Sequence, residues 1–105
     1  MPRFQQSVPY GGNKEEMAAK ISGFLIENGY NPAVYKNENV FKQGDGLITA
    51  EKYFKFSITP EGFFIEAFVM LFMVKESGIK GFTGIVAKRP LKKIVDKIIA
   101  MITAG

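Results

Sequence analysis

The sequence predicts an α+β domain in which an N-terminal helix, a four- to five-stranded, mainly antiparallel meander sheet and a C-terminal helix follow one another. Residues 63–74 carry a single charge and are rich in aromatic and β-branched side chains, which is typical of a strand buried on both faces. Residues 14–28 and 89–103 instead repeat apolar side chains at helical spacing. Both helices are expected to cover one face of the sheet.

The length of 105 residues fits one domain, and a hydrophobic content of 47% argues for a folded globule. Residues 1–12 contain two prolines and end in Gly-Gly, so we expect an extended N-terminal arm before a single domain over 13–105. The longest apolar run is shorter than the roughly 20 residues of a transmembrane helix. The N-terminus lacks the apolar core of a signal peptide, which predicts a cytoplasmic protein.

The chain contains neither cysteine nor histidine. This excludes thiol nucleophiles, zinc sites with the usual ligands and every Ser-His or Cys-His arrangement. Carboxylates, lysines, tyrosines and hydroxyls remain, so an enzyme has few parts to work with. We predict no catalytic residue, no metal site and no cofactor.

The first helix is expected over residues 14–28. Asn13 is placed to be its N-cap, and Glu16 completes a capping-box pattern three residues later. Gly29 is placed to be the C′ residue, and an Asn-Pro pair shortly after it prevents continuation.

Short strands are expected next, over residues 33–36 and 40–42. Residues 52–59 then alternate apolar and polar side chains, as a half-buried strand does. Pro60, Glu61 and Gly62 suit a three-residue hairpin loop with glycine in the left-handed region. That loop would pair Thr59 with Phe63 and leave the helices to pack on the face that carries Phe54, Phe56, Phe64 and Phe68.

The opposite face of the central strand would then carry a second apolar row, formed by Ile65, Ala67, Val69, Leu71 and Met73. An exposed apolar strip usually marks an interface, so this row is the candidate interface of a symmetric homodimer. Two alternatives stay open for it. An apolar ligand could cover it, or the N-terminal arm could do so through Phe4, Val8 and Tyr10.

Net charge is +4, and between Lys75 and Lys97 seven basic residues face two acids. Basic side chains crowd the first turns of the C-terminal helix, where the helix dipole favours anions: Lys88, Arg89, Lys92 and Lys93. These four form a candidate anion-binding site for a phosphorylated ligand, an anionic lipid or another acidic partner. A solvated helix face is the competing interpretation. A short edge strand is expected over 79–83 or 83–87.

Glu66 lies among aromatic residues in the central strand and is a candidate buried carboxylate. Pairing with a nearby lysine or a tyrosine hydroxyl would give it a structural role instead. Nucleotide binding is not favoured, because the glycines at 78, 81 and 84 match neither phosphate-loop motif. Nucleic-acid binding through residues 53–56 ranks low, because no RNA-binding motif accompanies their aromatic and lysine side chains.

The run GLITAEKYFKF at 46–56, followed by FIEAF at 64–68 and GFTGIVAKRPLKK at 81–93, resembles an uncharacterised small bacterial α+β domain. In some proteins of that kind a zinc-ribbon-like segment precedes the domain, and this chain lacks the cysteines for one. The resemblance covers roughly residues 14–100 and implies the domain boundaries, with no activity and no site residues.

Two functions follow from these patterns. The first is a non-enzymatic protein-interaction module that forms a homodimer through the second apolar row. The alternative is a small domain that binds an anionic or amphipathic molecule at the basic start of the last helix.

Overall fold

The computed structural model describes residues 3–44, 51–71, 75–77 and 88–104, and at 70–71, 75–77 and 88–90 it describes the backbone. The elements in chain order are β1 (Phe4–Pro9), α1 (Lys14–Glu27), β2 (Asn31–Tyr35), β3 (Glu38–Gln43), β4 (Glu51–Ile58), β5 (Gly62–Leu71), β6 (Lys75–Ser77) and α2 (Lys88–Ala104).

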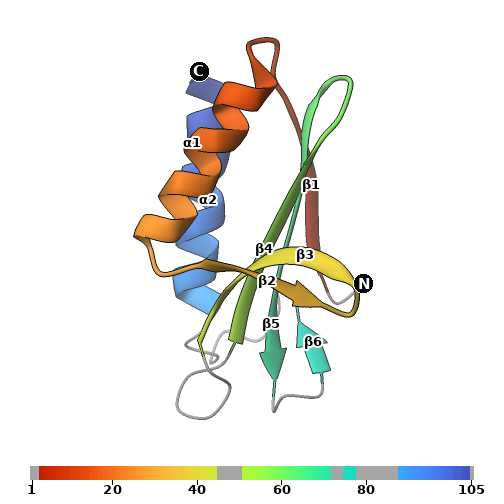
Figure 1. Ribbon diagram of the computed structural model, residues 1–105, viewed down its shortest axis with the longest axis vertical. Helices are drawn as coiled ribbons and strands as arrows, with labels where there is room; N and C mark the ends of the chain where they lie inside the picture. The colour runs from red at the N-terminus through yellow and green to blue at the C-terminus, as the bar shows by residue number, and fades with distance from the viewer. Residues whose placement is uncertain (1–2, 45–50, 72–74, 78–87, 105) are drawn as a thin grey trace.

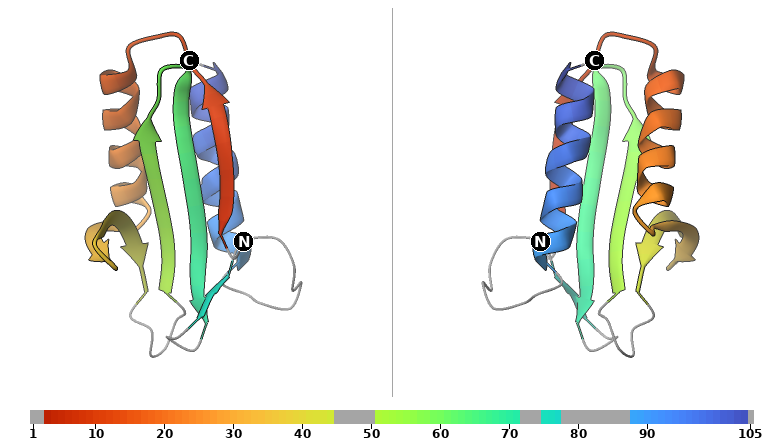
Figure 2. Two further views of the ribbon diagram at one scale, coloured as in Figure 1. Left: turned by 90° about the vertical axis from the view of Figure 1, so that its right-hand side faces the viewer. Right: turned by 90° about the vertical axis from the view of Figure 1, so that its left-hand side faces the viewer.

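The strands form one antiparallel sheet in the order β1-β5-β4-β3-β2, and β6 pairs with the end of β5. Both helices lie on the same face of this sheet (Figure 1), with α2 behind β5 and β1 and α1 beyond β4 (Figure 2). The predicted α+β class, the antiparallel meander from β2 to β5 and the placement of both helices are confirmed.

Part of the predicted N-terminal arm is a strand of the sheet. Phe4–Pro9 form β1, which pairs with β5 from Phe4 opposite Ala67 to Pro9 opposite Gly62. β6 (Lys75–Ser77) was not among the predicted strands. The strand expected at 79–83 or 83–87 and the residue Met73 lie outside the described part of the chain.

Helix α1 begins and ends as its sequence predicts. Asn13 accepts a hydrogen bond from the Glu16 N–H at 3.0 Å, which satisfies one of the orphan donors of the first turn. Gly29 has a φ of +87°, a conformation that glycine adopts without the steric cost of a side chain.

The main core lies between the helices and the sheet. It contains apolar side chains from α1, α2 and the helix-facing side of β1, β4 and β5, all of them nearly or fully buried: Val8, Met17, Ile21, Leu25, Tyr30, Phe54, Phe63, Ile65, Ala67, Val69, Leu91, Ile94, Val95, Ile98 and Ile102. Phe4 and Tyr10 pack against it from β1 and from the residue that follows β1.

The predicted register between β4 and β5 is wrong by one residue. Ile58 pairs with Phe63, and Phe54 pairs with Ala67. Because side chains alternate along a strand, this single step moves every β5 side chain to the other face. Ile65, Ala67 and Val69 therefore face the helices and are fully buried, whereas the Phe64 and Phe68 row faces away from them.

The cause lies in the turn at Gly62. Thr59 and Gly62 exchange backbone hydrogen bonds of 2.9 and 3.2 Å, so the loop has two residues, Pro60 and Glu61. Gly62 is not in the left-handed region but is the first residue of β5, opposite Pro9. A Cβ at Gly62 would overlap the Val8 carbonyl oxygen and the Tyr10 nitrogen. The glycine is needed there because β1 approaches so closely.

The β2–β3 hairpin projects from the sheet on the side away from the helices (Figure 1). Lys36 and Asn37, at its tip, have φ values of +48° and +67°, as the two-residue turns of tight hairpins do. A small second core fills the angle between this hairpin and the sheet: Val40, Tyr53 and Phe68, with Ala33 and Tyr35 packed against them. The Tyr53 and Phe68 rings stack with centroids 4.9 Å apart.

Within the described ranges, neither α1 nor α2 is long and apolar enough to cross a membrane.

Candidate functional site

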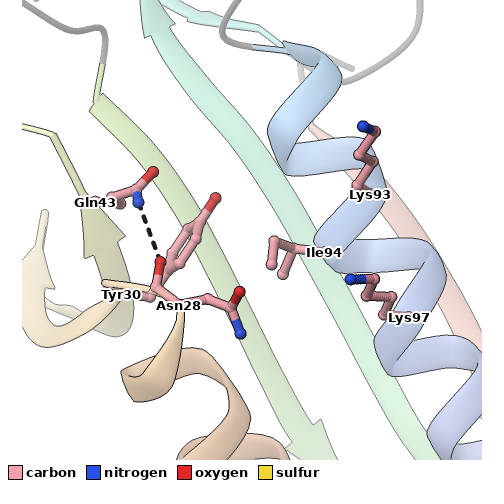
Figure 3. A pocket seen from close by; sticks show the side chains of 6 residues that line it. All are labelled: Asn28, Tyr30, Gln43, Lys93, Ile94 and Lys97. Carbon is pink, nitrogen blue, oxygen red and sulfur yellow. Dashed lines mark hydrogen bonds between the residues drawn. The ribbon is translucent and has the colours of Figure 1, made fainter.

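A pocket of about 240 Å³ opens between the end of α1, the end of β3 and the outer side of α2 (Figure 3). Six residues from these elements line it: Asn28, Tyr30, Gln43, Lys93, Ile94 and Lys97. The volume corresponds to about eight water molecules at roughly 30 Å³ each. The pocket is therefore the size of a small metabolite or an inorganic ion with its hydration shell.

The end of α1 places Tyr30 on the inner wall of the pocket. The Tyr30 N–H donates to the Leu25 carbonyl at 2.9 Å, and the Gly29 N–H donates to the Ile26 carbonyl at 3.0 Å. This pair of bonds is a Schellman motif, in which the residue after the glycine packs back onto the helix. Tyr30 accordingly joins Leu25 in the main core.

The Tyr30 hydroxyl is buried and has no hydrogen-bond partner in the part of the chain that the structure describes. Only 1% of the residue is exposed. Burial raises the pKa of this hydroxyl above its usual value, so the group is neutral and carries its proton. Figure 3 shows the hydroxyl on the side of the ring that faces α2. A buried, unpartnered hydroxyl costs about 1 to 3 kcal/mol.

Two side-chain amides form the wall opposite α2. The Gln43 Nε2 donates to the Asn28 carbonyl at 3.1 Å, shown as the dashed line in Figure 3. The Asn28 Nδ2 donates to the Phe24 carbonyl at 2.7 Å. Since only the NH₂ end of an amide can donate to a carbonyl, these bonds fix which end of each amide is the oxygen. Both amide oxygens remain without a donor among the described residues.

Two lysines on α2 supply the positive charge. Lys93 and Lys97 are one helical turn apart and flank the buried Ile94, and the Lys97 amino group turns toward the pocket (Figure 3). Asp96 is paired with Lys92 at 2.8 Å. None of the ion pairs between described residues includes Lys93 or Lys97, so both charges are available to a ligand.

A third lysine adds to the positive charge of this region. Lys52 pairs in register with Gln43, and the alternation along β4 places it on the helix-facing side with Phe54. It is only 7% exposed and forms no ion pair with a described residue. Burial lowers the pKa of its amino group from the usual value.

The structure describes the side chains of two of the four predicted anion-binding residues. Lys93 lines the pocket, and Lys92 pairs with Asp96 outside it. Lys88 and Arg89 belong to the first turn of α2, where the description covers the backbone. Sequence reasoning missed Lys97, which counted only as part of the polar helix face, and also Tyr30. The available signal for Tyr30 was its position directly after the C′ glycine.

The three described side chains of the candidate interface row are buried. Ile65, Ala67 and Val69 are each 0% exposed beneath the helices, so the prediction of an uncovered row is wrong for these three residues. Leu71 ends β5, and Met73 lies outside the described residues. The physical reason is the one-residue register change described above.

Glu66 is mostly covered but paired, on the face away from the helices. Its carboxylate accepts a hydrogen bond from Gln5 at 3.0 Å and lies 3.5 Å from Arg3 and 3.9 Å from Lys55. Pairing with nearby cations was the structural alternative for this residue. A second carboxylate, Glu38, also binds Arg3 and Lys55. Arg3, Glu38, Lys55 and Glu66 therefore form an ion-pair network with a structural role at the tip of the β2–β3 hairpin.

Comparison of the chain with protein-family models, with curated proteins and with solved structures found no match.

Proposed function

We propose that this protein is a small ligand-binding domain that holds an anion in the pocket between α1, β3 and α2. One observation carries the proposal: Tyr30 lines a pocket that Lys93 and Lys97 also line, and among the described residues its buried hydroxyl has no hydrogen-bond partner and the two lysines form no ion pair. Buried polar groups in folded proteins are almost always hydrogen-bonded, so an unpartnered one in a pocket wall points to a missing partner.

The charges favour an anion as that partner. Lys93 and Lys97 lie on one side of the pocket, and the buried Lys52 lies on the strand next to Gln43. None of the described residues that line the pocket carries a carboxylate. Charge-assisted hydrogen bonds from two ammonium groups and one hydroxyl would give a phosphate or carboxylate three donors. This site overlaps the predicted basic cluster at Lys93 only.

The proposal is tested by adding inorganic phosphate or acetate to the protein at low salt. Isothermal titration calorimetry measures the affinity, and amide chemical shifts locate the site. We expect millimolar affinity or better, with shifts concentrated at residues 28–30 and 93–97. Lys97→Met should weaken binding about tenfold, the value of one charge-assisted hydrogen bond. Lys92→Met is the matched control, because it removes the same charge from the same helix outside the pocket. An equal loss of affinity in both variants would mean that the anion is attracted by the overall charge of α2 and not bound in the pocket.

Self-association is the second candidate function. Because Ile65, Ala67 and Val69 are buried, the edge strand β2 is the surface that supports it. β2 lies at the edge of the sheet, and its Val34 is 71% exposed. A second copy could pair with this edge. Light scattering across a range of concentrations tests this, with Val34→Lys as the variant. A mass that stays monomeric at millimolar concentration would exclude a β2-mediated dimer.

A further inference from the structure

We propose that the outer face of α1 is a homodimer interface, on which α1 of a second copy packs antiparallel and crosses at Gly23. α1 forms one side of the molecule (Figure 2), so a second copy can reach it without a change in the fold. This surface is separate from the β2 edge and does not depend on anion binding in the pocket.

The outer face of α1 carries a short apolar stripe. Ala19, Gly23 and Ile26 follow one another at intervals of four and three residues, which places them on one side of the helix. All three residues are exposed, and 51% of Ile26 is exposed. The buried residues of α1 lie on the opposite side, in the main core. Single exposed isoleucines are common on protein surfaces, so the other residues of this face decide whether it is an interface.

Two residues of this face are unfavourable for an isolated α1. Gly23 lies in the middle of the helix, where glycine is less favourable than any residue except proline. It does not have a positive φ, and a Cβ at this position would lie in open space, so the described part of the fold has no steric need for glycine here. Glu27 ends the helix, where the helix dipole favours cations, and the last turn of α1 holds no basic residue. Sequences depart from such local rules mainly at functional sites, so both residues point to a contact outside this chain.

Gly23 fits the crossing point of two packed helices. The distance between helix axes depends on the side chains at the contact, and it is shortest where these are small. With Gly23 of both copies at the crossing, the helices can approach closely enough for Ile26 of each copy to cover Ala19 of the other. The exposed part of Ile26 would then be removed from water, which favours association.

The charges beside the stripe point to a second copy in antiparallel orientation. Lys20 and Glu27 are seven residues apart, close to two helical turns, and therefore lie on the same flank of the stripe. In an antiparallel pair related by a two-fold axis, equal flanks of the two helices face each other. Since Lys20 precedes Gly23 by three residues and Glu27 follows it by four, Lys20 of each copy lies opposite Glu27 of the other. A parallel pair would instead place like charges side by side, which is unfavourable.

Both charges are available for these contacts, and the expected dimer is weak. Lys20 and Glu27 are exposed, and none of the ion pairs between described residues includes either of them. α1 has 14 residues and is therefore about 21 Å long. A single helix pair of this length buries less than the roughly 1,200 Å² of a standard interface, so we expect a dissociation constant on the order of 100 µM.

Charge reversal tests the orientation of the two helices. Sedimentation equilibrium of the full chain, from micromolar to millimolar concentration at low salt, measures the dissociation constant. Lys20→Glu and Glu27→Lys should each weaken the dimer about tenfold, because two ion pairs become two repulsive contacts. Both substitutions in one chain restore opposite charges across the interface and should bring the dissociation constant back to within about threefold. A combined variant that dimerises no better than the single variants would overturn the antiparallel pairing.

Gly23→Gln tests the crossing point, because glutamine is a better helix former and its side chain would hold the two helices apart. The variant should raise the melting temperature of the monomer at micromolar concentration and weaken the dimer about tenfold. Ala100→Gln is the matched control on the exposed side of α2 and should leave the dissociation constant unchanged. If Gly23→Gln dimerised as well as the unmodified protein, the two helices would not cross at Gly23.

Ile26→Lys and Val34→Lys compare the α1 face with the β2 edge. Each substitution places a charge on an exposed aliphatic residue, so both variants are expected to fold. Ile26→Lys should abolish the dimer at millimolar concentration, whereas Val34→Lys should leave the dissociation constant within about twofold. The reverse result would place the second copy at β2 and overturn the α1 interface. An unmodified protein that stays monomeric at millimolar concentration would overturn it as well.

Discussion

Arg3 and Glu38 form a bidentate ion pair, with Nη1–Oε1 and Nη2–Oε2 distances of 2.9 and 2.8 Å. Arg3 directly precedes the edge strand β1, and Glu38 begins β3, which is separated from β1 by β5 and β4 in the sheet. The Arg3 guanidinium also lies 4.2 Å from the centroid of the Phe68 ring, and Lys55 binds Glu38 at 2.9 Å. This network ties the projecting hairpin to the far edge of the sheet over the second core.

The first prediction concerns this tie. Glu38→Gln should lower the free energy of unfolding by about 1 to 2 kcal/mol, because the pair is bidentate but still partly exposed to water. Urea denaturation measures the change. Glu61→Gln is the control, since Glu61 lies exposed in the turn between β4 and β5, and it should stay within about 0.5 kcal/mol. Equal stability of both variants would show that the network does not hold the hairpin.

The second prediction is the pH dependence of the same carboxylate. Hydrogen bonds from Arg3 and then Lys55 lower the pKa of Glu38 from 4.5 to about 2. Between these values the unfolded chain binds more protons than the folded one, so the contribution is complete above about pH 4.5 and disappears as pH falls toward 2. The stability difference between the unmodified protein and Glu38→Gln should shrink across that window. A stability difference that stays constant over this pH range would mean that the charge of Glu38 is not its source.

Local sequence patterns were sufficient to predict the helices and most of the strands. They were not sufficient to predict how the strands pair and which faces pack together. Asn13 and Gly29 predicted both ends of α1, because capping depends on residues a few positions apart. The β4–β5 register depended on β1, which comes over fifty residues before Gly62 and brings its backbone against it. A loop pattern of three residues could not carry that information.

The candidate site shows the same limit. Lys93 was predicted from the local density of basic residues on α2. Tyr30, Gln43 and Lys97 come from three separate elements, and only their packing places them around one pocket. Gln43 is polar at the end of a strand, which has many ordinary explanations. The orientation of its amide becomes informative only once the Asn28 carbonyl is seen to accept from it.

The third prediction concerns Lys52. Burial lowers the pKa of its amino group below the usual 10.5, so the folded protein bears a cost whenever the group is charged. Lys52→Met should therefore raise the free energy of unfolding at pH 7 by about 1 kcal/mol. Exposed Lys20 is the control, and Lys20→Met should change stability by less than about 0.5 kcal/mol.

The sign of the pH effect gives a second check on Lys52. The cost is complete below the folded-state pKa. As pH rises from that value toward 10.5, the unfolded chain binds more protons than the folded one, and the stability of the unmodified protein rises. The difference in free energy of unfolding between Lys52→Met and the unmodified protein should become smaller over this pH range. An advantage that grows at high pH would contradict a buried, unpaired ammonium.

The fourth prediction compares two glycines. Gly62→Ala should lower the free energy of unfolding by about 2 to 3 kcal/mol, because the new Cβ meets backbone atoms of β1 that cannot move aside as a side chain can. Gly23→Ala places the same methyl in open space on an exposed helix position and should raise stability by about 0.5 to 1 kcal/mol. Thermal unfolding of both variants measures the contrast. A neutral Gly62→Ala would contradict the close approach of β1.

The fifth prediction compares the effect of the Tyr30 hydroxyl on stability with its effect on phosphate binding. The Tyr30 hydroxyl is buried without a partner among the described residues, so Tyr30→Phe removes a desolvated group and keeps the ring that packs against Leu25. In ligand-free buffer the variant should be more stable by about 1 kcal/mol. Phosphate should bind to it about tenfold more weakly, because the donor is lost. Leu25→Val serves as the control, since it weakens the same packing contact and should lower stability without changing phosphate affinity. A Tyr30→Phe variant that is less stable and binds phosphate normally would mean that the hydroxyl serves the fold and not a ligand.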